Sequence, residues 1–407
     1  MPEKIYKISI AGCGKVAHLH AKAIQNIPNA RLSGVWSRTP KTAKDFASQY
    51  KTRAYSSINQ MVVENEIDLV IVCTPHPFHW QPAVEAAEAG ANVLVEKPLA
   101  SNLQDCDAII NACKVRYVKL GVISQRRWYP PVIRVKEAID AGKIGKPVLS
   151  TVTVLGWRDK AYYDADAWRG KWQTEGGGVL VNQSPHQLDI LLWYMGDIEE
   201  VYGVWRNLNH PYIEVEDTAL AIVKFKSGAI GNILVSNSQK PGIYGNIHVH
   251  GENGASVGVQ TDGGAMFIAG MTGIAEPPVN DLWTVPGEEN MLKKWVKQDT
   301  EFFNSCDPIV YFMKCQIEDF INAIKDDREH AVSGEVGRKT VELFTAIYRS
   351  TRDNQPVKFP LKLEPGLDGR QKLFEDKRKK TKDQRRTNSP FEEPVPRQRK
   401  GQGDVKI

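Results

Sequence analysis

Short apolar segments alternate with longer amphipathic ones over the first 125 residues of the chain. The apolar segments have the length of buried strands, and the segments between them have the spacing of helices. This alternation predicts a doubly wound parallel sheet, because parallel strands are joined by crossover helices. The strands that the pattern predicts are Tyr6–Ala11, Leu32–Trp36, Ile67–Cys73, Ala91–Val95 and Leu120–Ser124.

The pattern changes after residue 125. Apolar and polar positions now alternate within strand-like segments, and turn signals such as Lys226-Ser227-Gly228 separate them. This predicts a second, mainly antiparallel sheet with one face open to solvent or to a partner subunit. Amphipathic helices are expected over 307–326 and 335–350. The predicted strands are Pro147–Leu155, Glu200–Trp205, Thr218–Phe225, Ala229–Asn237 and Asn246–His250.

Composition and charge narrow the class of protein. The 407 residues are 42% hydrophobic and 25% charged, with no signal-peptide pattern and no apolar run of membrane-spanning length. Residues 365–407 hold 13 Lys/Arg and 7 Asp/Glu, so the rest of the chain has a formal charge of −1 although the whole has +5. A near-neutral body argues against nucleic-acid binding. The six cysteines form no Cys-x-x-Cys pair, so we expect a cytoplasmic protein with reduced thiols.

The end of the chain has a different composition from the body. Residues 363–407 lack periodicity and are rich in Pro, Gly, Gln and charge. Such a segment cannot bury enough apolar surface to order itself, so we predict a disordered basic tail. A solvated extension is favoured over a contact with nucleic acid or membrane.

The first strand runs directly into Gly12-Cys13-Gly14-Lys15-Val16-Ala17, a Gly-x-Gly-x-x-Ala turn that opens a helix. The first glycine permits the tight turn, and the second lets the backbone approach a pyrophosphate. The helix N-terminus then offers free N–H groups to the anion. In this strand–turn–helix context the motif predicts a nicotinamide dinucleotide site formed by Gly12, Cys13, Gly14, Lys15 and Val16.

The other strand ends of this sheet are expected to face the same dinucleotide, because ligands bind outside the carboxyl ends of parallel strands. Ser37-Arg38-Thr39 lies where the adenosine ribose belongs and holds no acidic residue. Arg38 suits a 2′-phosphate, although Thr39 also fits a helix cap, so NAD versus NADP stays open. No metal site is expected, since the histidines here lack metal-ligand neighbours. The further cofactor-binding candidates are Thr74, Pro75, His79, Glu96, Lys97 and Gln125.

A second group of candidates follows the glycine run 176–178. The stretch after it is helix-like and ends at Gly196, so Asn182, His186 and Asp189 share one face at i, i+4 and i+7. The alternative for Asp189 is a local cap or pair. Aromatic and basic side chains nearby suit a polyhydroxylated substrate, and the candidates for binding it are Arg127, Trp128, Tyr163, Trp168, Arg169, Asn182 and His186.

Taken in order, the nucleotide motif, Glu96-Lys97-Pro98, Gln125-Arg126-Arg127 and the 176–189 block resemble the Gfo/Idh/MocA oxidoreductases. This family includes glucose–fructose oxidoreductase and inositol dehydrogenase, and the resemblance covers about residues 5–360. It implies a Rossmann dinucleotide-binding domain over 1–125. It also implies an α/β domain for substrate binding and oligomerisation over 126–362, as a homodimer or homotetramer.

The resemblance further implies NAD(P)-dependent oxidation or reduction of a sugar, glycoside or cyclitol. Lys97, residue 182 and His186 match the family's catalytic positions, but many members carry Asp where this chain has Asn182. Asn cannot take a proton, so we expect it to orient the substrate. We predict His186 as general base, since imidazole titrates at about 6.5. Lys97 is the expected cation beside the alkoxide, and burial would let it share the proton relay.

Two other functions stay open. Some family relatives, as the resemblance implies, hold NAD tightly and oxidise a sugar transiently, as lyase- or hydrolase-type enzymes. The other is a non-catalytic dinucleotide-binding sensor, against which Lys97 and His186 together argue. The sequence names neither the sugar nor the direction of the reaction.

Overall fold

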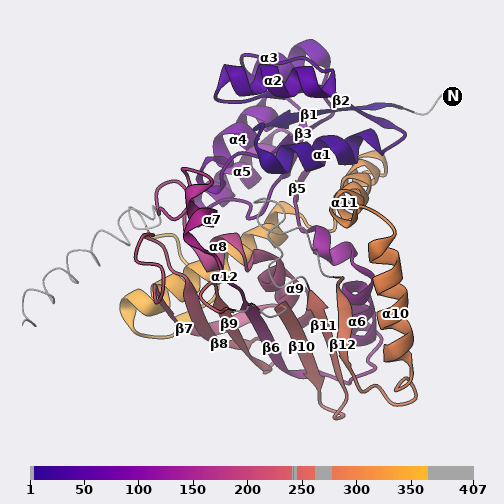
Figure 1. Ribbon diagram of the computed structural model, residues 1–407, viewed down its shortest axis with the longest axis vertical. Coiled ribbons are helices and arrows are strands. Elements are labelled where there is room, and N and C mark those ends of the chain that lie inside the picture. Colours follow the sequence, from indigo (N-terminus) through magenta and orange to yellow (C-terminus); the bar gives the residue numbers. More distant parts are fainter. Residues whose placement is uncertain (1–3, 241, 243–244, 262–276, 365–407) are drawn as a thin grey trace, which may run out of the picture.

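The computed structural model describes residues 4–240, 242, 245–261 and 277–364, and it contains two sheets (Figure 1). The predicted basic tail lies outside the described residues from residue 365 onward. Within the described ranges, no helix has both the length and the apolar character that crossing a membrane requires.

The first sheet has the strand order β2-β1-β3-β4-β5, and every neighbouring pair is parallel. This confirms the doubly wound sheet predicted from the apolar runs. Alternate strand residues fall into two apolar clusters, one with α3, α4 and α5 and the other with α1, α2 and the distant α11. The elements are β1 (Tyr6–Ala11), α1 (Lys15–Gln25), β2 (Ala30–Trp36), α2 (Pro40–Tyr50), α3 (Ile58–Asn65), β3 (Leu69–Val72), η1 (His76–Phe78), α4 (Trp80–Glu88), β4 (Asn92–Val95), α5 (Leu103–Val115) and β5 (Leu120–Val122).

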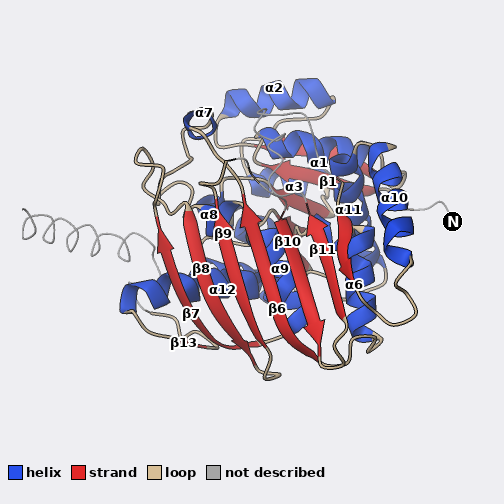
Figure 2. Ribbon diagram, turned by 60° about the horizontal axis from the view of Figure 1, so that its bottom comes forward, coloured by secondary structure: helices blue, strands red, loops and turns tan. Residues whose placement is uncertain are grey.

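The second sheet has the order β12-β11-β10-β6-β9-β8-β7-β13. Among the described strands of this sheet, only β6 and β9 pair in parallel, which confirms a mainly antiparallel sheet. The helices α9 and α12 lie behind it in Figure 2, and no helix of the described residues covers the other face. Its strands are β6 (Pro147–Leu155), β7 (Ile198–Arg206), β8 (Thr218–Phe225), β9 (Ile230–Ser236), β10 (Gly245–Gly251), β11 (Ser256–Thr261), β12 (Val279–Trp283) and β13 (Val357–Lys358).

The helices of the second half pack against both sheets. α11 covers the first sheet beside α1, and α12 contacts β5 and β7, so the chain returns to its first half near its end. These helices are η2 (Gln125–Trp128), α6 (Pro130–Asp140), α7 (Lys160–Asp164), α8 (Val179–Asn182), α9 (Pro185–Met195), α10 (Met291–Asn304), α11 (Pro308–Lys325) and α12 (Gly334–Asp353).

Candidate active site

A cavity of about 640 Å³ lies between the strand ends of the first sheet and the end of β6 with the α7–α9 region. It brings together predicted residues from both halves of the chain. Those that line it are Gly12, Cys13, Gly14, Lys15, Val16, Ser37, Arg38, Thr39, Thr74, Pro75, His79, Glu96, Lys97, Gln125, Trp168, Arg169, Asn182 and His186.

The glycine turn at one end of the cavity has the shape of a dinucleotide cradle. Gly12 has φ of +102°, and a Cβ there would lie 2.7 Å from the Cys73 carbonyl carbon. Gly14 is the N-cap of α1, and a Cβ on it would meet no atom within 4 Å. The helix has neither a capping side chain nor an acidic residue in its first turn. Its N–H groups and positive dipole end therefore suit a pyrophosphate.

The end of β2 offers a cation and an aromatic face. The exposed Arg38 guanidinium lies 5.4 Å from the centre of the Phe78 ring, and both residues line the cavity. Thr39 is the N-cap of α2 but makes no side-chain capping hydrogen bond, and Pro40 follows it at the first helical position. The stacked Arg38 suits contact with the adenosine end of a dinucleotide.

Glu96 and His79 hold the strand ends in place. The Glu96 carboxylate lies 2.7 Å from His20 Nε2 and accepts the Lys97 backbone N–H at 3.0 Å. Burial raises the pKa of Glu96, but the His20 hydrogen bond and the Lys97 charge lower it overall. The buried His79 ring lies within 2.9 Å of the Pro98 carbonyl oxygen, and the Lys97–Pro98 peptide bond is cis. Both side chains thus fix the loop that carries Lys97.

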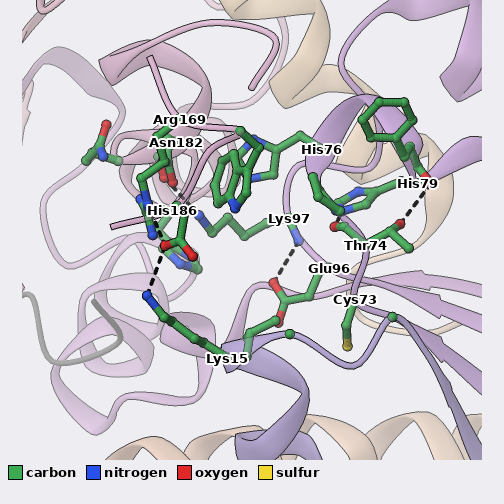
Figure 3. A pocket seen from close by; sticks show the side chains of 18 of the residues that line it. Lys15, Cys73, Thr74, His76, His79, Glu96, Lys97, Arg169, Asn182 and His186 are labelled. Atoms are coloured by element: carbon green, nitrogen blue, oxygen red, sulfur yellow. Dashed lines mark hydrogen bonds and ion pairs between the residues drawn. The ribbon is translucent and has the colours of Figure 1, made fainter. Parts of the chain in front are cut away.

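Lys97 extends from β4 toward the second half of the molecule, between Glu96 and the wall that carries Asn182 and His186 (Figure 3). Its ammonium donates to the Asn182 carbonyl oxygen at 2.8 Å. Burial lowers the pKa of Lys97 to about 8, with Arg126 and Arg169 adding to the effect and Glu96 opposing it. This amine therefore exchanges a proton near neutral pH, which few lysines do.

His186 lies at the start of α9 and is 8% exposed. Burial, together with the charges of Arg126 and Lys97, holds the pKa of His186 well below its usual range. The imidazole is consequently neutral throughout the physiological pH range. It can orient a hydroxyl by hydrogen bonding, but its basicity is lower than the sequence suggests.

A buried carboxylate, Glu175, stands behind Asn182, and the sequence-based list of site residues lacks it. Asn182 Nδ2 donates to Glu175 Oε1 at 2.6 Å and lies 3.1 Å from the Tyr162 hydroxyl. Burial raises the pKa of Glu175 to about 7, against the hydrogen bonds from Gly170 and Asn182. Its position directly before the glycine run was the available signal.

The structure places three predicted substrate-binding residues away from the cavity lining. Arg127 forms a buried ion pair with Asp189, with Nη2 2.6 Å from Oδ1. Trp128 stacks on His330 at a ring separation of 6.1 Å. Tyr163 is 7% exposed and packs edge-on against Tyr162. None of the three lines the cavity, so their predicted contact with substrate has no support in the geometry of this site.

The predicted continuous helix after the glycines is two helices. α8 ends at Asn182 and α9 begins at Pro185, which has no N–H to continue a helix. The break separates Asn182 from His186 and Asp189, which stay together on α9. Asp189 pairs with Arg127 and does not line the cavity. The glycines approach the chain itself: a Cβ on Gly178 would lie 1.8 Å from the Glu216 carbonyl oxygen.

An ion cluster joins the dinucleotide turn to the segment after α7. Lys15 lies 3.0 Å from Asp166, and the same carboxylate oxygen accepts from Arg169 Nε at 3.0 Å (Figure 3). Arg126 and Arg158 also line the cavity, and neither is in the sequence-based list. Arg158 follows the end of β6, which is the signal that could have found it.

Two family models match the chain. Residues 6–124 match an oxidoreductase family with an NAD-binding Rossmann fold, and residues 132–257 match the GFO/IDH/MocA C-terminal domain. The WlbA dehydrogenase from Bordetella pertussis, crystallised with NADH and UDP-GlcNAcA, has a TM-score of 0.78 at 29% identity. That match covers 89% of this chain and 100% of the WlbA chain.

Two inositol dehydrogenases are similar in sequence. The scyllo-inositol 2-dehydrogenase (NAD(+)) of Bacillus subtilis (strain 168) is 31% identical over 247 residues, which cover 58% of this chain and 68% of the relative. The myo-inositol 2-dehydrogenase of Thermotoga maritima is 29% identical over 256 residues, with coverages of 61% and 73%. The chain therefore belongs to the GFO/IDH/MocA family of oxidoreductases, and its first sheet is the NAD-binding Rossmann fold of that family.

Proposed function

We propose that the chain transfers a hydride between a secondary alcohol of a sugar, glycoside or cyclitol and a nicotinamide dinucleotide. The observation that carries this proposal is the meeting of Lys97 and His186 at one cavity beside the dinucleotide turn. The inositol dehydrogenases and the WlbA structure support the substrate class, since their named ligands are polyhydroxylated rings.

The residues of the chain would manage the proton. A dinucleotide held along Gly12–Val16 supplies the hydride chemistry. We assign the proton acceptor to the neutral amine of Lys97, because its pKa of about 8 lets it exchange a proton near neutral pH, whereas burial holds the pKa of His186 well below its usual range. His186 and Asn182 orient the hydroxyl. This reverses the sequence-based roles of Lys97 and His186, and burial is the reason.

The direct test offers the purified protein NAD⁺ or NADP⁺ with a panel of sugars and inositols, and measures formation of the reduced dinucleotide. We expect net reduction with at least one polyol. If no member of the panel reduces either dinucleotide, and no matching ketone oxidises the reduced form, the proposal fails.

A second candidate rests on one relative. The 2,7-anhydro-N-acetylneuraminate hydratase of Escherichia coli is 26% identical over 269 residues, and its name describes no net oxidation. A transient-oxidation mechanism with tightly held NAD requires the dinucleotide to stay bound through gel filtration without accumulating in reduced form. Net accumulation with a polyol favours the dehydrogenase.

The pH dependence follows from Lys97. Below a pKa of about 8 the amine is protonated and cannot accept the substrate proton. We expect kcat/KM for alcohol oxidation to rise tenfold per pH unit up to about pH 8 and then to level, while ketone reduction falls above that pH. Glu175→Gln removes a charge that raises the pKa of Lys97, so the inflection moves to lower pH. An oxidation rate that falls above pH 8 contradicts the assignment.

Arg38 offers a test of cofactor choice. We expect Arg38→Gln to weaken NADP⁺ by about tenfold and NAD⁺ by less than about twofold, because only NADP⁺ carries the 2′-phosphate for a charge-assisted hydrogen bond. Phe78→Leu is the control. It should weaken the binding of NADP⁺ and NAD⁺ alike, since the Phe78 ring lies beside the adenosine that both cofactors carry. Equal losses in Arg38→Gln, measured by titration, contradict a phosphate contact.

We also propose a homodimer or homotetramer in the cytoplasm. The open face of the second sheet exposes Tyr202, Leu220 and Ile222, the last to 59%, and apolar patches of this kind commonly pair between subunits. The six cysteines are unpaired thiols, which fits a reducing compartment. Light scattering of the purified chain measures the assembly, and a monomer at all concentrations contradicts it.

A further inference from the structure

Arg158 is a buried cation on the cavity wall formed by the second half of the chain. It follows β6, and its backbone N–H donates to the Asn237 carbonyl oxygen at 3.1 Å. The residue is 6% exposed and lines the cavity. The hydrogen bond to Asn237 therefore fixes the backbone of Arg158 at the end of the second sheet. The small exposed part of the residue faces the cavity.

The charge of Arg158 has no counter-ion among the residues that the structure describes. Its Nη1 donates to the Trp157 carbonyl oxygen at 2.9 Å, and the guanidinium lies 5.5 Å from the centre of the Tyr162 ring. Its buried Nε has no hydrogen-bond partner in the described ranges. The guanidinium also hydrogen-bonds to the Tyr162 side chain, but a neutral hydroxyl does not balance its charge. A buried charge without a counter-ion is costly, so natural proteins keep one where a ligand completes it.

Three carboxylates that line the cavity or lie beside it are already bound by other groups. Asp166 accepts from Lys15 and Arg169, and Glu96 pairs with His20. Glu175 accepts from Asn182 and from a backbone N–H. The wall opposite the dinucleotide turn thus presents an unneutralised guanidinium, and burial lowers the pKa of Arg158 accordingly.

We propose that Arg158 binds an anionic group of the substrate, a carboxylate or a phosphate, while Lys97 engages the reacting hydroxyl. The planar guanidinium presents two parallel N–H donors that match two oxygens of such a group. Tyr162 connects the two sites, since it lies beside Arg158 and its hydroxyl is 3.1 Å from Asn182 Nδ2. The inference rests on the proposed function for the hydroxyl and goes beyond it in requiring an acidic or phosphorylated sugar or cyclitol.

Calorimetry with matched pairs tests this inference. The protein is saturated with NADH, so that an alcohol binds without reacting, and is titrated with D-glucuronate against D-glucose and with myo-inositol 1-phosphate against myo-inositol. We expect the anionic member of at least one pair to bind about tenfold more tightly or better. A preference within the first pair identifies a carboxylate, and within the second a phosphate. Binding is read without turnover, so this result is independent of dehydrogenase activity.

Variants then locate the effect. Arg158→Gln should remove the preference, and Arg158→Lys should retain part of it. Arg206→Gln, which removes the same charge from an exposed position on β7, should keep it whole. Equal binding within both pairs by the unaltered protein overturns the inference, as does a preference that survives Arg158→Gln. An equal loss of NADH affinity in Arg158→Gln also overturns it, because Arg158 would then face the cofactor's pyrophosphate.

Discussion

Replacing Lys97 by Met is expected to lower kcat/KM for alcohol oxidation by about a thousandfold. Methionine keeps much of the length and bulk but has no amine to take the proton, and a positioned general base is worth about 10²–10⁴ in rate. The dinucleotide turn follows β1, which β3 separates from β4, so the dissociation constant of NAD⁺ should change by less than about twofold. Lys171→Met, at an exposed position outside the cavity lining, is the matched control.

The pH profile distinguishes loss of a base from loss of a contact. Lys97→Met should abolish the inflection near pH 8, and His186→Ala should lower turnover by about a hundredfold while leaving that inflection in place. Exogenous small primary amines should restore part of the activity of a Lys97→Ala variant. Wild-type turnover in Lys97→Met, or an unchanged profile, contradicts the role assigned to Lys97.

The parts of the fold that local sequence determines were predictable. The apolar strands, the turn at Gly12 and the end of α9 at Gly196 depend on residues adjacent in the chain. The strands β11 and β12 were missed. β11 contains Gly258 and β12 contains Asn280 and Asp281, which are residue types depleted in strands, and pairing with neighbouring strands overrides that local preference.

The candidate site shows the same division. Residues at strand ends, such as Lys97 and Arg38, could be placed because the topology of a parallel sheet puts strand ends together. The pKa shifts of Lys97 and His186 could not be predicted, because they depend on burial by segments from both halves of the chain. Arginine is a residue type that often binds ligands, so the sequence favoured that role for Arg127. Its buried ion pair with Asp189, 62 residues away, could be found only from the structure.

The buried pair of Arg127 and Asp189 supplies the second large expected effect, on stability. Arg127 donates from Nε and Nη2 to the two carboxylate oxygens at 2.7 and 2.6 Å, and Ser124 donates to the same carboxylate. The Arg127 and Asp189 side chains are 6% and 7% exposed, so solvent cannot replace either partner. The pair joins η2 to α9, which carries His186.

Arg127→Met is therefore expected to lower the free energy of unfolding by about 3–5 kcal/mol, because it leaves the Asp189 carboxylate buried without a counter-ion. The double variant Arg127→Met/Asp189→Leu removes both charges and should recover most of that loss. Denaturant unfolding monitored by circular dichroism measures both, with the exposed Arg206→Gln as the control. If Arg127→Met instead leaves stability unchanged and weakens only substrate binding, Arg127 is a ligand-binding residue after all and the ion pair contributes little to the fold.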